Sequence, residues 1–161
     1  MYPIVFQIGP LTVYSFGVFM ALAALTAAWV ASAELKRRNL APSALALVGF
    51  SQGTMMALHV GLRRAAAPFA IVGYSGLLAL PPDANPEKLA AEVKSRPPVL
   101  LVHGDRDDLI PPQALFHAAS GLAALGVPVE WHMSYGIGHG IDQDGLRHGG
   151  EFLARRLAAT R

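Results

Sequence analysis

A serine bracketed by glycines stands where the sequence changes from a strand pattern to a helix pattern. In the stretch LALVGFSQGTMMALHVGLRR, four apolar residues lead into Gly49, Ser51 and Gly53, and an apolar helical pattern follows. Gly-x-Ser-x-Gly between a strand and a helix is typical of a nucleophile elbow, a sharp turn that lifts the serine hydroxyl clear of the sheet. We expect glycines at both flanks because side chains there would collide with the neighbouring strand and helix. The sequence therefore predicts a nucleophilic Ser51 beside the free N–H groups of a helix N-terminus, which can stabilise an oxyanion.

A serine alone is a poor nucleophile, so a base and an orienting acid must lie elsewhere in the chain. The stretch PPVLLVHGDRDDLIPP is an apolar strand that ends in a glycine turn with three carboxylates, those of Asp105, Asp107 and Asp108. The stretch VEWHMSYGIGHGI is a strand followed by His139, which stands between two glycines. The order serine, acid, histidine is that of α/β-hydrolase triads. Both segments follow strand ends, where open α/β sheets place their sites.

Short apolar strands alternate with amphipathic helices from about residue 44 onward. The strands are bounded by Gly or Pro and are almost continuously apolar, which favours a parallel sheet covered on both faces. We expect strands at 45–48, 69–74, 99–103 and 127–133, and helices at about 52–64, 86–95, 112–125 and 142–158. The predicted fold class is α/β: a truncated α/β-hydrolase with a mostly parallel sheet of about four strands flanked by helices, preceded by an apolar N-terminal helix.

The first 33 residues contain no charged side chain. Residues 11–33 are long enough, as a helix, to cross a hydrocarbon core of about 30 Å. The cluster Lys36, Arg37 and Arg38 follows, and the positive-inside rule would place it in the cytoplasm. The sequence therefore predicts a transmembrane-like helix at about 14–38. The alternatives are a buried core helix and a signal peptide, and the latter would lack its positively charged n-region.

Composition excludes several classes of function. The 161 residues suit one domain of ordinary size, and the hydrophobic fraction is 53% against a charged fraction of 15%. The net charge of +2 comes from scattered Lys and Arg, without the basic run that nucleic-acid binding favours. The chain has no cysteine, and its six histidines form no His-Glu-x-x-His pair. We therefore expect no metal, no cofactor and no nucleic-acid partner.

In the N-terminal segment, residues 1–42, a short IGP lead precedes an apolar helix in YPIVFQIGPLTVYSFGVFMALAALTAAWVASAELKRRNLAP. This segment resembles the start of bacterial prolipoprotein diacylglyceryl transferases. The resemblance covers about a quarter of the chain, and the later sequence matches none of that family's remaining helices. The transferase reaction is therefore not implied. We expect two parts, an apolar N-terminal segment over 1–42 and the C-terminal portion of an α/β-hydrolase domain over 43–161.

The remainder, about residues 43–160, resembles the phospholipase/carboxylesterase family of α/β-hydrolases, which includes acyl-protein thioesterases. The stretches LALVGFSQGTMMALHVGLRR, HGDRDDLIP and GIGHGI carry this resemblance. It implies Ser51 as nucleophile, His139 as general base and acid, and Asp107 as the residue that orients the imidazole. Asp107 is implied because the family's acid is the one in His-Gly-x-x-Asp, with the other two aspartates of the cluster as rivals. The same pattern implies the backbone N–H of Gln52 as one oxyanion donor.

Other prominent side chains have structural interpretations. We expect His103, at a strand end, to be a hydrogen-bonded structural histidine. Met55 and Met56 should pack under the elbow, with the lining of an acyl pocket as the alternative, because Met adapts to flexible chains. Trp131 should pack in the core of the last strand. The remaining histidines lack partner motifs and are expected to be ordinary surface or core residues.

We expect the chain to act as a serine carboxylesterase or thioesterase on short- to medium-chain acyl esters. We also expect it in the cytoplasm, with attachment to the inner membrane through residues 11–33 as an alternative. The family places about four strands and two helices before the elbow, including the loop that supplies a second oxyanion N–H. Only some 44 residues precede that point here, so we expect weak activity and self-association through an exposed sheet edge. The competing hypothesis is a non-catalytic fusion or fragment whose apolar N-terminus serves as membrane anchor or oligomerisation element.

Overall fold

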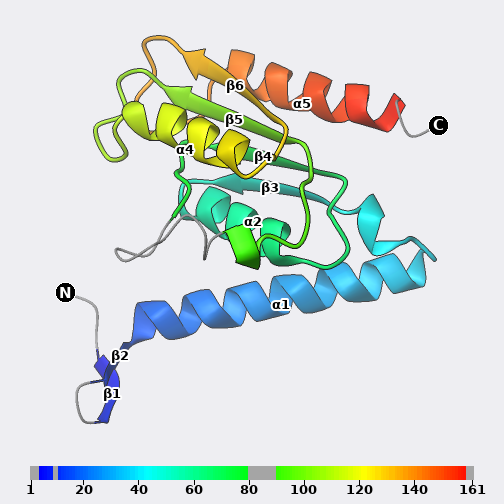
Figure 1. The fold of residues 1–161 in the computed structure, drawn as a ribbon. Coiled ribbons are helices and arrows are strands. Elements are labelled where there is room, and N and C mark those ends of the chain that lie inside the picture. Colours follow the sequence, from blue (N-terminus) through cyan, green and yellow to red (C-terminus); the bar gives the residue numbers. More distant parts are fainter. Residues whose placement is uncertain (1–3, 9–10, 80–89, 159–161) are drawn as a thin grey trace. The chain divides into compact units, whose positions relative to one another are not determined.

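The computed structural model describes residues 4–8, 11–79 and 90–158. The chain forms two compact units, Met1–Ala41 and Pro42–Arg161. In the first unit, strand β1 (Ile4–Ile8) pairs antiparallel with β2 (Leu11–Tyr14), and helix α1 (Ser15–Arg37) follows (Figure 1). The predicted apolar helix is therefore present.

Two expectations for the first unit differ from what is observed. Residues 11–14, expected to open the apolar span, form strand β2, since Thr12, Val13 and Tyr14 are β-branched or aromatic. Within the described part of the chain, no helix combines the length and the apolar character that crossing a membrane requires. The predicted transmembrane character of residues 11–33 is therefore not supported.

The second unit begins with a 3₁₀ turn (Pro42–Ala44) and contains a sheet of four strands. The strands are β3 (Ala46–Phe50), β4 (Ala70–Tyr74), β5 (Val99–Gly104) and β6 (Val129–Ser134). They lie in the order β3-β4-β5-β6, and each neighbouring pair is parallel. The predicted parallel sheet of four strands flanked by helices is confirmed, and its strand bounds differ from the predicted ones by at most two residues.

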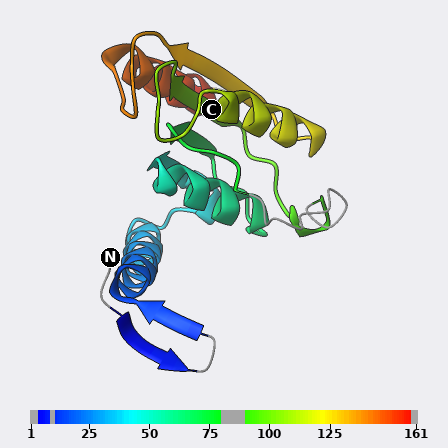
Figure 2. The same ribbon diagram turned by 90° about the vertical axis from the view of Figure 1, so that its left-hand side faces the viewer.

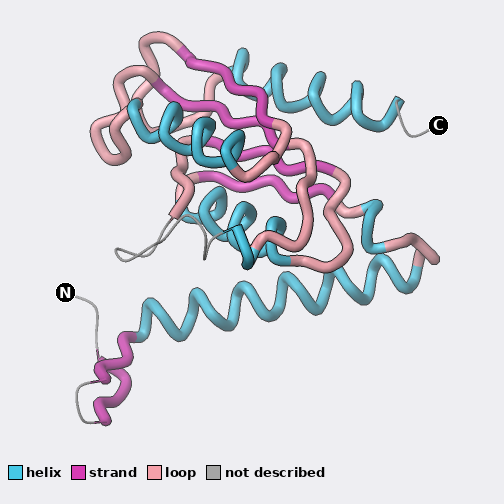
Figure 3. The backbone as a smooth tube through the Cα atoms, viewed as in Figure 1, coloured by secondary structure: helices cyan, strands magenta, loops and turns pink. Residues whose placement is uncertain are grey.

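Helices cover both faces of this sheet. Figures 1 and 2 show α2 (Gln52–Arg63) and α4 (Gln113–Ala124) on one face and α5 (Gln143–Ala158) on the other. The tube in Figure 3 shows loops leading from the strands to these helices. The central strands β4 and β5 are buried along their whole length, because helices cover both faces of the sheet, and their sequences are almost continuously apolar. Of the helix expected at 86–95, residues 86–89 lie outside the described part of the chain, residues 90–92 are helical, and residues 93–95 are not.

Two apolar clusters hold the layers together. Ile71 and Leu101 point toward α2 and α4, where they pack with Leu58. Their neighbours along the strands point the other way and pack against Phe152 of α5, which is fully buried. This alternation fixes the register of the strands, since a shift by one residue would exchange the two faces.

One core expectation for the sheet is wrong. Trp131 was expected inside the last strand, yet 51% of its surface is exposed. The reason is that β6 ends the order of strands, so its outer region is covered less than that of β4 or β5. Trp131 instead packs edge-on against the exposed Phe116, with ring centroids 5.2 Å apart.

Candidate active site

Ser51 occupies a strained turn between β3 and α2. Its φ of 54° and ψ of −119° lie in a region of backbone conformation that residues other than glycine rarely adopt. A Cβ added to Gly49 would lie 2.3 Å from the carbonyl carbon of Gly53. The backbone at residue 49 can therefore approach the backbone at residue 53 this closely only if residue 49 is glycine. A Cβ on Gly53, by contrast, would meet no described atom within 4 Å. The expected steric need for glycine thus holds at the first flank and is wrong at the second.

The side chains of three predicted residues form a continuous chain of hydrogen bonds. The Nε2 atom of His139 lies 2.9 Å from the hydroxyl oxygen of Ser51. The Nδ1 atom of the same imidazole lies 2.8 Å from Oδ2 of Asp107. These groups come from the carboxyl ends of β3, β5 and β6, which meet at one edge of the parallel sheet. The arrangement matches the order nucleophile, base and acid.

Asp107 is held as an ionised carboxylate. Only 3% of the residue is exposed, and its Oδ1 atom accepts backbone N–H bonds from Leu109 at 3.0 Å and Ile110 at 2.9 Å. Burial raises the pKa of Asp107, but the bonds from Ile110, His139 and Leu109 outweigh it and leave the pKa below its ordinary value. An ionised Oδ2 requires Nδ1 of His139 to carry the proton, so Nε2 is free to accept the proton of the serine hydroxyl.

The two rival aspartates are not in this chain of bonds. Asp105 accepts a backbone bond from Gly136 at 2.6 Å and so holds the loop after β6. Asp108 is exposed. His103 is buried, and its Nε2 atom lies 2.9 Å from the carbonyl of Ile110, in agreement with the structural role expected for it. The same atom is 3.3 Å from Oδ2 of Asp107, a contact that no sequence pattern predicts.

Two further side chains support the imidazole, and sequence reasoning missed both. Ser75, which has a φ of 44°, donates its hydroxyl to the carbonyl of Gly140 at 3.0 Å, next to His139. The ring of Phe50 lies 5.0 Å from the imidazole, measured between centroids. The available signal was position: Ser75 directly follows β4, at the same edge of the sheet as the other site residues.

The N-terminus of α2 offers a donor for an oxyanion. The N–H groups of Thr54 and Met55 both bond to the carbonyl of Ser51. Within the described residues, the N–H of Gln52 bonds to no backbone carbonyl, so it is available to a ligand beside the serine hydroxyl. Met56 is 45% exposed, so the expectation that it packs under the elbow is wrong.

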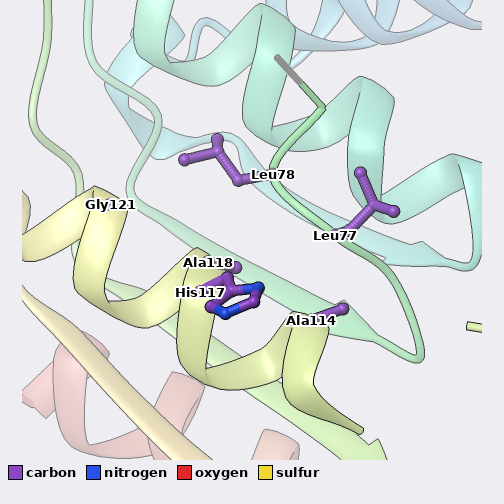
Figure 4. Close-up of a pocket in the computed structure, with 6 residues that line it drawn as sticks. All are labelled: Leu77, Leu78, Ala114, His117, Ala118 and Gly121. Carbon is purple, nitrogen blue, oxygen red and sulfur yellow. The ribbon is translucent and has the colours of Figure 1, made fainter. Parts of the chain in front are cut away.

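An apolar pocket of about 210 Å³ lies between α4 and the segment that follows β4 (Figure 4). Figure 4 shows Leu77 and Leu78 on one side and Ala114, His117 and Ala118 on the other. Both walls start near the edge that carries the site, because Leu77 comes two residues after Ser75 and α4 follows the Asp107 loop.

In the described residues, no group of three or more His, Asp or Glu side chains could hold a metal ion.

This fold and this constellation of side chains are those of an α/β-hydrolase. The family model described as Phospholipase/Carboxylesterase matches residues 19–157, and the chain belongs to this family. The match includes residues 19–42, part of the segment for which a resemblance to prolipoprotein diacylglyceryl transferases was expected. That second resemblance stays a prediction.

Individual relatives agree with this assignment. Acyl-protein thioesterase 1 of Gibberella zeae is 30% identical over 119 residues, which are 74% of this chain and 51% of that protein. The crystal structure of esterase PE8 is 44% identical with a TM-score of 0.69, covering 77% of this chain and 55% of the other. Arabidopsis thaliana SOBER1 shares the fold at 22% identity, with a TM-score of 0.71 and coverage of 84% and 64%. The chain spans about half the length of the thioesterase and the esterase.

Proposed function

We propose that the chain is a serine carboxylesterase or thioesterase that hydrolyses short- to medium-chain acyl esters or thioesters. The observation that carries this proposal is the bonded series from Ser51 through His139 to Asp107, with separations of 2.9 Å and 2.8 Å. Family membership supports the same class of reaction. A non-catalytic chain would not need a strained serine aligned with an imidazole, so this alternative is disfavoured.

In the proposed mechanism, the Ser51 oxygen attacks the acyl carbonyl while its proton passes to Nε2 of His139. The Asp107 carboxylate stabilises the imidazolium, and the N–H of Gln52 receives the oxyanion. The tetrahedral intermediate then expels the alcohol or thiol, which takes the proton from Nε2. A water molecule attacks the resulting acyl-enzyme by the same route, releases the carboxylic acid and restores the serine.

The acyl-chain preference is proposed from the pocket beside α4. Its lining is apolar except for His117, and its volume of about 210 Å³ is modest. Apolar pockets of this kind bind alkyl chains through the hydrophobic effect, which stabilises by about 0.8 kcal/mol per buried methylene. The pocket therefore favours acyl groups of limited length.

Labelling with a fluorophosphonate probe tests the nucleophile. Wild type, Ser51→Ala and Ser120→Ala should be compared, because Ser120 is an exposed serine on α4. We expect labelling and turnover of p-nitrophenyl butyrate in wild type and Ser120→Ala, and neither in Ser51→Ala. Folded wild-type protein that is not labelled, or Ser51→Ala that retains turnover, would rule out this function.

We also propose that the exposed strand β3 mediates self-association. Val48 is 60% exposed and Phe50 40% exposed, and β3 is the terminal strand of the sheet. An edge strand with exposed apolar side chains is a template for pairing, and a second copy presents the same strand about a two-fold axis. Val48→Lys should lower the mass measured by light scattering, whereas the helix variant Val60→Lys should not.

Membrane attachment through residues 11–33 remains a prediction, to be tested by sedimentation with lipid vesicles.

A further inference from the structure

The side chain of Thr54 fills a slot made by glycine backbone at the start of α2. Only 1% of the residue is exposed. A Cβ added to Gly73 would lie 2.4 Å from its Cγ2 atom, and one added to Gly76 would lie 2.4 Å from its Cβ. Residues 73 and 76 must therefore lack side chains for a threonine to enter. The slot fits this one side chain closely.

The Thr54 hydroxyl bonds outside its own helix. A threonine within a helix usually returns its hydroxyl to a carbonyl three or four residues earlier in the same helix. Here Oγ1 lies 2.9 Å from the carbonyl oxygen of Gly49 and 2.8 Å from that of Tyr74, so the hydroxyl proton is shared between two strands. The carbonyl of Tyr74 also accepts the N–H of Ser51 at 2.8 Å. One acceptor therefore joins Thr54 to the backbone of the serine.

We infer that Thr54 is a positioning residue that holds the Ser51 backbone in its strained conformation. The inference rests on the proposed esterase or thioesterase function for its effect on rate. A φ of 54° persists only where the surroundings fix it. The Thr54 hydroxyl fixes the carbonyls on either side of the turn, that of Gly49 before it and that of Tyr74 on the adjacent strand. Without the hydroxyl, the serine oxygen should drift from its 2.9 Å contact with His139.

The first test compares Thr54→Ser with Thr54→Ala in the full chain. Both variants lose the methyl group, and only the serine keeps the hydroxyl. We expect Thr54→Ser to keep a kcat within about threefold of wild type, and Thr54→Ala to lose about 10-fold to 100-fold in kcat with an unchanged KM, because small misplacements of a reacting group carry penalties of this size. Equal kcat values for the two variants would overturn the inference.

A second measurement does not depend on activity. Hydrogen exchange of the Ser51 amide reports its bond to the Tyr74 carbonyl directly. We expect exchange in Thr54→Ala to be at least about tenfold faster than in wild type and Thr54→Ser, while core amides of β5 keep their protection. If wild type shows no turnover, the proposed function fails, yet the exchange rates still decide the role of Thr54. Equal Ser51 exchange in all three proteins would refute it.

Discussion

The two oxygens of the Asp107 carboxylate have different hydrogen-bond partners: Oδ2 faces His139, and Oδ1 accepts bonds from the backbone. Oδ2 lies 2.8 Å from Nδ1 of the imidazole, while Oδ1 is fixed by two backbone N–H groups. The backbone therefore sets which oxygen meets the histidine. An orienting acid held in this way leaves the imidazole one tautomer that suits proton transfer from Ser51.

Asp107→Asn should remove activity while keeping the shape of the side chain. The amide oxygen should take the place of Oδ1, which accepts the two N–H bonds, so the NH₂ group would face Nδ1 of His139. That arrangement favours the wrong tautomer, and we expect kcat to fall by about 10³–10⁴. Asp108→Asn, an exposed neighbour, is the control and should keep wild-type kcat. A loss below about tenfold in Asp107→Asn would contradict the role proposed for it.

The two glycines around Ser51 should respond differently to alanine. Gly49→Ala places a methyl group 2.3 Å from the backbone of Gly53, so we expect it to lower the free energy of unfolding by about 2–3 kcal/mol and to suppress turnover. Gly53→Ala meets open space in the first turn of α2 and should stay within about 1 kcal/mol of wild type. Urea unfolding and turnover of p-nitrophenyl butyrate measure both effects. Equal behaviour of the two variants would mean that the turn differs from the one described.

Filling the pocket beside α4 should shorten the accepted acyl chain. Ala114→Phe adds a ring to the wall opposite Leu77 and Leu78 (Figure 4). We expect kcat/KM for p-nitrophenyl octanoate to fall at least about tenfold while the value for acetate changes less than about twofold. Ala123→Phe, at an exposed position of the same helix, is the matched control. A uniform loss for acetate and octanoate would place acyl binding elsewhere.

His132 should make the protein less stable in mild acid. The centroid of its ring lies 3.9 Å from that of the His148 ring. Burial, followed by the charge of His148 and that of Arg147, lowers the pKa of His132. The charges of Asp142 and Asp144 oppose this effect without reversing it. The unfolded chain then binds a proton more readily than the folded one, so stability falls as the pH drops below about 6.5.

A neutral replacement tests this pH dependence. His132→Gln should lose less Tm than wild type between pH 7.5 and pH 5, as measured by circular dichroism at matched ionic strength. His59→Gln, an exposed histidine on α2, serves as the control and should follow the wild-type curve. Parallel Tm curves for wild type and His132→Gln would show that this pair does not govern acid stability.

Most of the sheet and the nucleophilic serine can be predicted from the sequence, because both depend on patterns of neighbouring residues. Apolar runs bounded by Gly or Pro mark β4 and β5, and the Gly-x-Ser-x-Gly turn marks Ser51. Residues alone left three aspartates open, and only the family resemblance favoured Asp107. Asp107 and Asp105 differ in the backbone N–H groups that bond to their carboxylates. The spacing of residues in the sequence does not predict such bonds.

Contacts between distant segments were beyond sequence reasoning. The Thr54 hydroxyl meets a carbonyl 20 residues away, and the Ser75 hydroxyl meets one 65 residues away. Neither residue has an unusual neighbour in the sequence, so only the tertiary structure reveals their partners. Trp131 was misplaced for a similar reason, because strand order, and not hydrophobicity, decides which strand lies at the edge.

The parallel order β3-β4-β5-β6 also affects how the chain folds. Ser51 and His139 are 88 residues apart in sequence, and they can meet only after the intervening strands have aligned. Loop closure over such distances is slow compared with the formation of helices such as α2 or α5. After dilution from denaturant, helical circular dichroism should therefore return well before the serine becomes reactive, which makes nucleophile reactivity a late reporter of native topology.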